Sequence, residues 1–205
     1  MCEQTIRESL CGAGQCELLA TPGDSGLGVL NIDELGIMRC WHPVVRTAAG
    51  WVVFEAAALG QHGSEVDQNV DRLTSRIENN DAGEFLLIEY ADHIYERNWD
   101  YADFEDEDAE PPPWETIDAE SVVVCRRDGV PACTQPITVR YEYRGDDGTT
   151  GDYSAQLSLR GGTIVIAAVT SSGKVELGVD RRDWEGILML PAGEYEFGQL
   201  ATPRP

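Results

Sequence analysis

The sequence predicts a mainly β protein, in which an α+β N-terminal half is followed by an all-β antiparallel sandwich. Three observations lead to this fold class: short β-rich runs before residue 60, one run with helical period over residues 64–80, and strict alternation of apolar and polar residues after residue 121. We therefore expect an α+β domain over 1–97, an acidic connector over 98–120 and a β-sandwich domain over 121–205.

The N-terminal half combines strands with the one helix that the pattern predicts clearly. Three β-rich runs bounded by turn residues come first, at 28–32, 36–41 and 50–59. Over 64–80, Val66, Val70, Leu73 and Ile77 recur at intervals of a helical stripe, with Ser64 as a plausible N-cap. The next run, 84–90, favours a buried strand followed by irregular chain, although a second helix also fits its spacing.

The C-terminal half alternates apolar and polar residues in short runs separated by Gly, Asp and Pro turns. The expected strands are 121–125, 137–143, 153–160, 163–169, 175–179, 186–190 and 194–200. The ending LPAGEYEFGQL is similar to the last hairpin of many small β-sandwiches, a resemblance that says nothing about function. This spacing of strands predicts an antiparallel sandwich.

Charge is the most unusual property of the chain. It has 37 acidic and 15 basic residues, a net charge of -22. Residues 98–120 hold 10 acids and no base, whereas the 97 residues before them hold 16 acids and 6 bases. Such a field disfavours direct nucleic-acid binding and anionic membranes, and it favours basic partners. A salt-adapted composition is the alternative explanation of the acidity.

The acidic connector also carries aromatic residues, which predicts a partner-binding surface. Carboxylates can steer a basic protein at long range, and rings can supply the desolvated anchors that carry affinity. The residues expected to bind are Trp99, Asp100, Tyr101, Asp103, Phe104, Glu105, Asp106, Glu107, Asp108 and Trp114. The competing interpretation is a solvated linker whose prolines keep two domains apart and whose rings dock on them.

The six cysteines leave several chemistries open. Cys11, Cys16, Cys40 and His42 are the residue types of a tetrahedral zinc site, but their spacing is loose, and core or free thiols are favoured over zinc or a disulfide. Cys125 and Cys133 flank an Asp-Gly turn, so they could form a hairpin disulfide or remain two unpaired thiols, and the thiols are preferred.

These patterns predict a non-enzymatic acidic binding protein of the inhibitor or immunity class, with a basic protein partner such as a nuclease. No catalytic residue and no cofactor is expected, zinc aside. The alternatives are a structural or assembly subunit, which could form a homo-oligomer, and a small zinc-binding protein or metalloenzyme. No apolar targeting segment and no run of about 18 apolar residues is visible, so we expect a cytoplasmic protein. Cys2, directly after the first Met, leaves a lipoprotein-derived N-terminus open.

Overall fold

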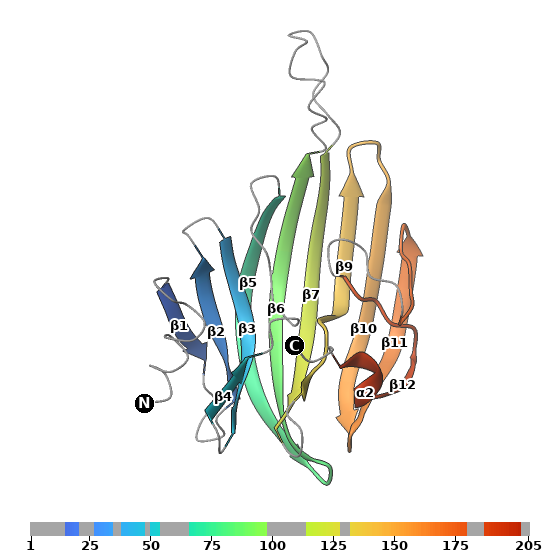
Figure 1. The fold of residues 1–205 in the computed structure, drawn as a ribbon. Helices are drawn as coiled ribbons and strands as arrows, with labels where there is room; N and C mark the ends of the chain where they lie inside the picture. Colours follow the sequence, from blue (N-terminus) through green and yellow to red (C-terminus); the bar gives the residue numbers. More distant parts are fainter. Residues whose placement is uncertain are drawn as a thin grey trace.

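The protein is mostly antiparallel β structure (Figure 1). The computed structural model describes residues 15–20, 27–34, 38–47, 50–53, 66–97, 114–127, 132–179 and 187–201. The first part of the chain forms a four-stranded sheet in the order β1-β2-β3-β4, with the bounds Gln15–Ala20, Leu27–Glu34, Met38–Thr47 and Gly50–Val53. Among the described residues there is no helix long and apolar enough to cross a membrane.

The rest of the described chain forms one eight-stranded sheet that does not close on itself. Its order is β12-β11-β10-β9-β7-β6-β5, and β8 pairs with β7 beside this path. The strands are β5 (Val66–Asn80), β6 (Gly83–Arg97), β7 (Trp114–Arg126), β8 (Ala132–Cys133), β9 (Ile137–Gly145), β10 (Thr150–Arg160), β11 (Thr163–Gly173) and β12 (Gly193–Glu196). Antiparallel β structure is therefore confirmed, but these strands follow one another across one sheet, where the sequence predicted two packed layers.

The helix predicted over 64–80 is wrong, because Val66–Asn80 is strand β5, paired with β6 along most of its length. The residues interpreted as a helix stop form the hairpin turn instead. Asn80 Oδ1 accepts a hydrogen bond from Ala82 N at 2.9 Å, and Gly83 has a φ of 123° that favours glycine. Apolar residues at every third or fourth position favour a helix only weakly. Pairing of the segment with a long apolar strand can override this local preference.

That neighbour is β6, whose first half is buried on both faces. Phe85, Leu86, Leu87 and Ile88 are at most 1% exposed, as expected of a central strand rather than of an edge strand. The strand predicted over 84–90 is confirmed. It continues to Arg97, where irregular chain was expected.

The C-terminal strands agree with the sequence up to residue 173, and the first part of the strand predicted over 194–200 is confirmed as β12 (Gly193–Glu196), whereas the other described residues after 173 differ. The described residues 174–179 and 187–190 are not strands, and 197–200 is the short helix α2 (Phe197–Leu200). Helical geometry brings residues three apart to the same side, so both Phe197 and Leu200 are buried. In Figure 1, α2 lies at the end of the sheet where β10 ends and β11 begins.

Two apolar clusters form the described core. One gathers residues of β6, β7, β9 and β11 beneath α2, and the other surrounds Tyr141, Tyr143 and Tyr153. Residues 187–190 join the two clusters, because Leu188 and Leu190 pack in the first and residues 187 and 189 in the second. Hydrogen bonds hold this segment: Thr138 N donates to Leu188 O at 2.9 Å, and Tyr153 Oη donates to Leu190 O at 2.8 Å.

Cys125 and Cys133 form a disulfide between β7 and β8, so the preference for two unpaired thiols was wrong. The two cysteines face each other in register and are fully buried. The next residue continues this connection, because Thr134 N donates to Val124 O at 2.8 Å and Thr134 Oγ1 accepts from Val124 N at 3.0 Å. Gln135 N then donates to Leu200 O at 3.0 Å. The disulfide thus lies directly beside the contacts that attach α2 to the sheet.

We predict that the double substitution Cys125→Ser/Cys133→Ser lowers the free energy of unfolding by roughly 2–3 kcal/mol, the entropy estimate for a loop of this length. The cysteines are eight residues apart in sequence. Urea unfolding of the variant against the untreated wild type measures the change. An identical midpoint for the two proteins would contradict the prediction.

Tyr153 predicts a loss of stability at alkaline pH. Burial raises the pKa of its phenol to about 12, above the value of about 10 in an unfolded chain. The folded state therefore favours the neutral phenol, and its contribution is complete below pH ~10 and falls as pH rises towards 12. Tyr153→Phe should reduce this dependence and cost about 1 kcal/mol at neutral pH through the lost hydrogen bond. Urea unfolding of both proteins between pH 8 and 12 tests both expectations. If the free energy of unfolding fell with pH equally steeply in Tyr153→Phe and in the wild type, the prediction would be wrong.

Candidate functional site

The acidic aromatic stretch joins two neighbouring strands of one sheet. The pairing of β6 with β7 runs from Phe85 opposite Arg126 to Arg97 opposite Trp114, so both ends of residues 98–113 start at the same end of the sheet. This is the end opposite α2 (Figure 1). The connector predicted over 98–120 is shorter than expected, because residues 114–120 belong to β7. Strands from both predicted halves lie side by side here.

Most of the predicted partner-binding residues lie outside the described residues. These are Trp99, Asp100, Tyr101, Asp103, Phe104, Glu105, Asp106, Glu107 and Asp108. The backbone of Trp114 begins β7 opposite Arg97, and its side chain is outside the described set. The binding role of this stretch stays a prediction.

The described sheet pairs its own positive charges. Within the described residues from 66 onward there are 18 acids and 9 bases, whereas 98–113 has seven acids and no base. Seven basic side chains of the sheet lie within ion-pair distance of carboxylates of the same sheet: Arg72, Arg76, Arg127, Arg140, Arg144, Arg160 and Lys174. These seven basic side chains therefore have carboxylate partners within the sheet, and the acids of 98–113 are not needed to pair with them.

The predicted zinc ligands are only partly placed. Cys16 lies in β1 opposite Ile32, and Cys40 in β3 lies opposite the same Ile32, so β2 separates the two at one level of the sheet. His42 follows two residues later in β3. Cys11 and all four side chains fall outside the described set. Zinc binding by these residues is not tested.

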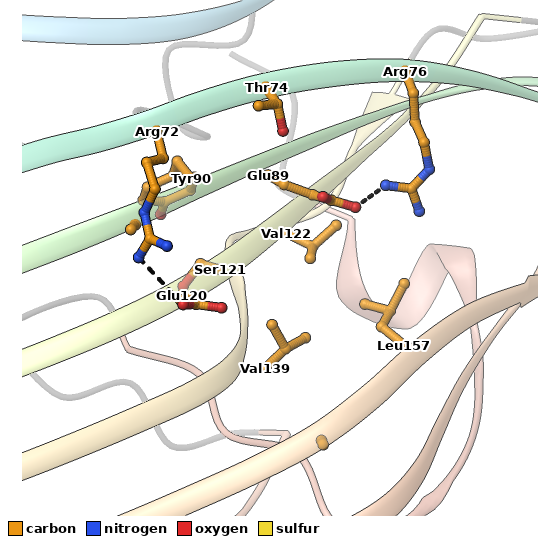
Figure 2. A pocket seen from close by; sticks show the side chains of 12 residues that line it. Arg72, Thr74, Arg76, Glu89, Tyr90, Glu120, Ser121, Val122, Val139 and Leu157 are labelled. Atoms are coloured by element: carbon orange, nitrogen blue, oxygen red, sulfur yellow. Dashed lines mark hydrogen bonds and ion pairs between the residues drawn. The ribbon is translucent and has the colours of Figure 1, made fainter.

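A groove that the sequence did not predict crosses one face of the large sheet (Figure 2). It has a volume of about 400 Å³, within the lower range of small-molecule pockets. Its lining comes from β5, β6, β7, β9 and β10: Arg72, Thr74, Arg76, Glu89, Tyr90, Ala91, Glu120, Ser121, Val122, Val139, Ala155 and Leu157.

One end of the groove is polar. Arg72 Nη2 lies 3.3 Å from Glu120 Oε1, and Arg76 forms an ion pair with Glu89 from the neighbouring strand. The side chains of Arg72 and Arg76 are 74% and 48% exposed. Arg72 keeps a free edge towards solvent, whereas Arg76 also donates to Glu78 through Nε and Nη2. Thr74 is exposed between them on the same strand (Figure 2).

The other end of the groove is apolar. Val122, Val139 and Leu157 come from three strands and lie across from the arginines in Figure 2. Val122 is part of the buried core, whereas Val139, Ala155 and Leu157 are only partly buried against it. Polarity therefore changes along the groove, from charged at β5 to apolar at β9 and β10.

Sequence reasoning missed this groove because it read β5 as a helix. In a strand, residues two apart share a face, so Thr74 and Arg76 point to the same side, and the irregularity between Asp71 and Thr74 brings Arg72 to the groove as well. In a helix, Arg72 and Arg76 would share a face and Thr74 would point away from it. The segment DRLTSR does not mark this face by alternation of apolar and polar residues, because Asp71 and Ser75 are polar too. The other lining residues come from four further strands and carry no local signal.

The charged side chains of the groove are engaged with one another. Its charged groups are arginine–glutamate pairs, and an arginine side chain stays protonated in proteins and so is a poor general acid or base. Comparisons with models of protein families, with curated proteins and with solved structures give no match.

We predict that residues 99–112 can be replaced by a four-residue Gly/Asn turn without unfolding the sheet. Both ends of the stretch are held by the β6–β7 register, and shortening a loop changes closure entropy only slowly. Circular dichroism and urea unfolding should show a cooperative transition within about 1 kcal/mol of the wild type. Loss of cooperative unfolding would show that the stretch is needed for the fold.

Proposed function

We propose that the protein is a non-enzymatic, inhibitor- or immunity-like binding protein that engages a basic protein partner through residues 98–113. The observation that carries the proposal is the position of this stretch. Its seven acids and three aromatic residues connect β6 to β7, and the two strand ends that flank them are paired at one end of a sheet whose own described cations are largely paired.

Presentation on a hairpin suits such a role physically. A loop whose two ends are held together has less freedom to lose on binding than a free chain of the same length. Concentrated carboxylates raise the association rate with a basic protein, and rings can fill pockets on it. Carboxylates can also occupy a cleft built for phosphates, which is why we favour a nuclease or another nucleic-acid-binding protein as the partner.

The disulfide bears on where this binding takes place. A buried disulfide such as Cys125–Cys133 is rare in a reducing cytosol and common in oxidising compartments. We therefore propose an oxidising compartment, such as the cell exterior, in place of the cytoplasm expected from the sequence.

Charge-neutral variants test the proposal. The loop variant carries Asp100→Asn, Asp103→Asn, Glu105→Gln and Asp106→Asn. The matched control removes the same charge from exposed positions of the sheet and its turns, with Asp81→Asn, Asp146→Asn, Asp152→Asn and Glu176→Gln. Association with a panel of basic nucleases is measured by surface plasmon resonance at 50, 150 and 300 mM NaCl, together with nuclease inhibition.

We expect the loop variant to lose about tenfold or more in association rate and much of the salt dependence, while the control changes less than about threefold. Equal losses in the two variants would show that only net charge matters. Either that result or a lack of binding across the panel would refute the proposal.

A further inference from the structure

We propose that the groove of Figure 2 is a binding site for a small amphipathic anion, with its acidic head at the β5 end and its hydrocarbon part at the β9–β10 end. This goes beyond the proposed function, because the described residues that line the groove belong to β5, β6, β7, β9 and β10.

The β5 end offers donors for an anionic head. Arg72, Thr74 and Arg76 all come from β5 and line the groove, and Arg72 lies at an irregularity of the strand, where its φ is 52°. Thr74 lies between the two arginines in Figure 2, so a hydroxyl stands between the two guanidiniums. A guanidinium has five N–H donors, and Arg72 uses only one of them in its hydrogen bond to Glu120. An acidic head can therefore bind the free edge of an arginine and the Thr74 hydroxyl together.

The two glutamates act as supports for the arginines. Glu120 contacts Arg72 at 3.3 Å and Arg140 at 3.6 Å, and Arg76 is held by both Glu78 and Glu89. Each glutamate therefore already has a positive partner. Four arginines of the groove and its rim (Arg72, Arg76, Arg140, Arg144) form ion pairs with four glutamates (Glu78, Glu89, Glu120, Glu142), so the charges of these pairs balance, with Asp118 as a further acid near Arg140.

The opposite end fits a hydrocarbon group. From β5 to β10 the groove spans four strand spacings, about 19 Å. Val122, Val139, Ala155 and Leu157 line the far end, and covering their partly exposed surface removes apolar area from water. A ligand with one acidic group and a chain of medium length matches both ends.

The position of the groove argues against two other occupants. It lies on the face of paired strands, whose backbone groups are engaged in the sheet, so an extended peptide cannot add to it as a further strand. The net charge of -22 repels a polyanion such as nucleic acid, whereas a single acidic head meets only the local, balanced charge.

Titration with decanoate and with decanol at 0.15 M NaCl distinguishes the contribution of the acidic head to the affinity from that of the hydrocarbon chain, because the two ligands differ only in the head group. Wild-type protein should bind decanoate at least about tenfold more tightly than decanol, because charge-assisted hydrogen bonds to arginine are strong. Arg72→Gln/Arg76→Gln should weaken decanoate binding by about tenfold or more and change decanol binding by less than about twofold. Isothermal titration calorimetry gives the affinities.

Two further variants complete the test. Val139→Thr, which keeps the shape of the side chain, should weaken both ligands by several-fold through the tail. Arg160→Gln removes an equally exposed arginine, paired with Glu194 outside the groove, and should change neither affinity. Thermal unfolding checks that each variant is folded. Equal affinity for decanoate and decanol, or equal effects of the groove and Arg160 variants, would overturn the inference without bearing on the role of residues 98–113.

Discussion

The pairing of β6 with β7 is the constraint on which the rest of the described structure depends. It spans every position from Phe85 to Arg97, and the first half of β6 is buried on both faces. In the second half of β6, Tyr90 and Ile94 are buried and His93 is exposed, so a shift of one residue would turn the buried side chains to the other face and the register is strongly determined. This register brings the two ends of residues 98–113 together. It also places Glu89 and Glu120 on the face of the groove, where the arginines of β5 reach them.

The distribution of charge follows from the same sheet. Seven of the nine basic residues described from 66 onward lie beside carboxylates, so the arginines that line the groove are paired. Such exposed pairs contribute little stability individually. Their effect is on recognition: the seven acids between β6 and β7 can attract a basic protein, while the groove can accept a single anionic head. The two proposed sites therefore differ in the charge of what they bind.

The C-terminal part of the chain is held to the sheet by a small set of contacts. The Cys125–Cys133 disulfide, the hydrogen bonds of Thr134 with Val124 and the bond from Gln135 N to Leu200 O follow one another in space. Residues 187–190 add a second attachment, since their side chains alternate between the two apolar clusters. Together these contacts bury Phe197 and Leu200 against the core beneath α2.

The sequence by itself determined the antiparallel β character, the strands from 137 to 169, the buried strand at 84–90 and the concentration of acid in 98–113, because alternation and composition are local properties. Only the tertiary structure decided the rest. Val66–Asn80 is a strand because β6 offers it a partner, a long-range effect that outweighs its helical spacing. Phe197–Leu200 is a helix because two side chains three apart share one core. The disulfide depends on the β7–β8 register, and the groove depends on five strands meeting on one face. The strand pairing of β5 and the groove depend on partners elsewhere in the sheet, which the pattern within one segment does not specify.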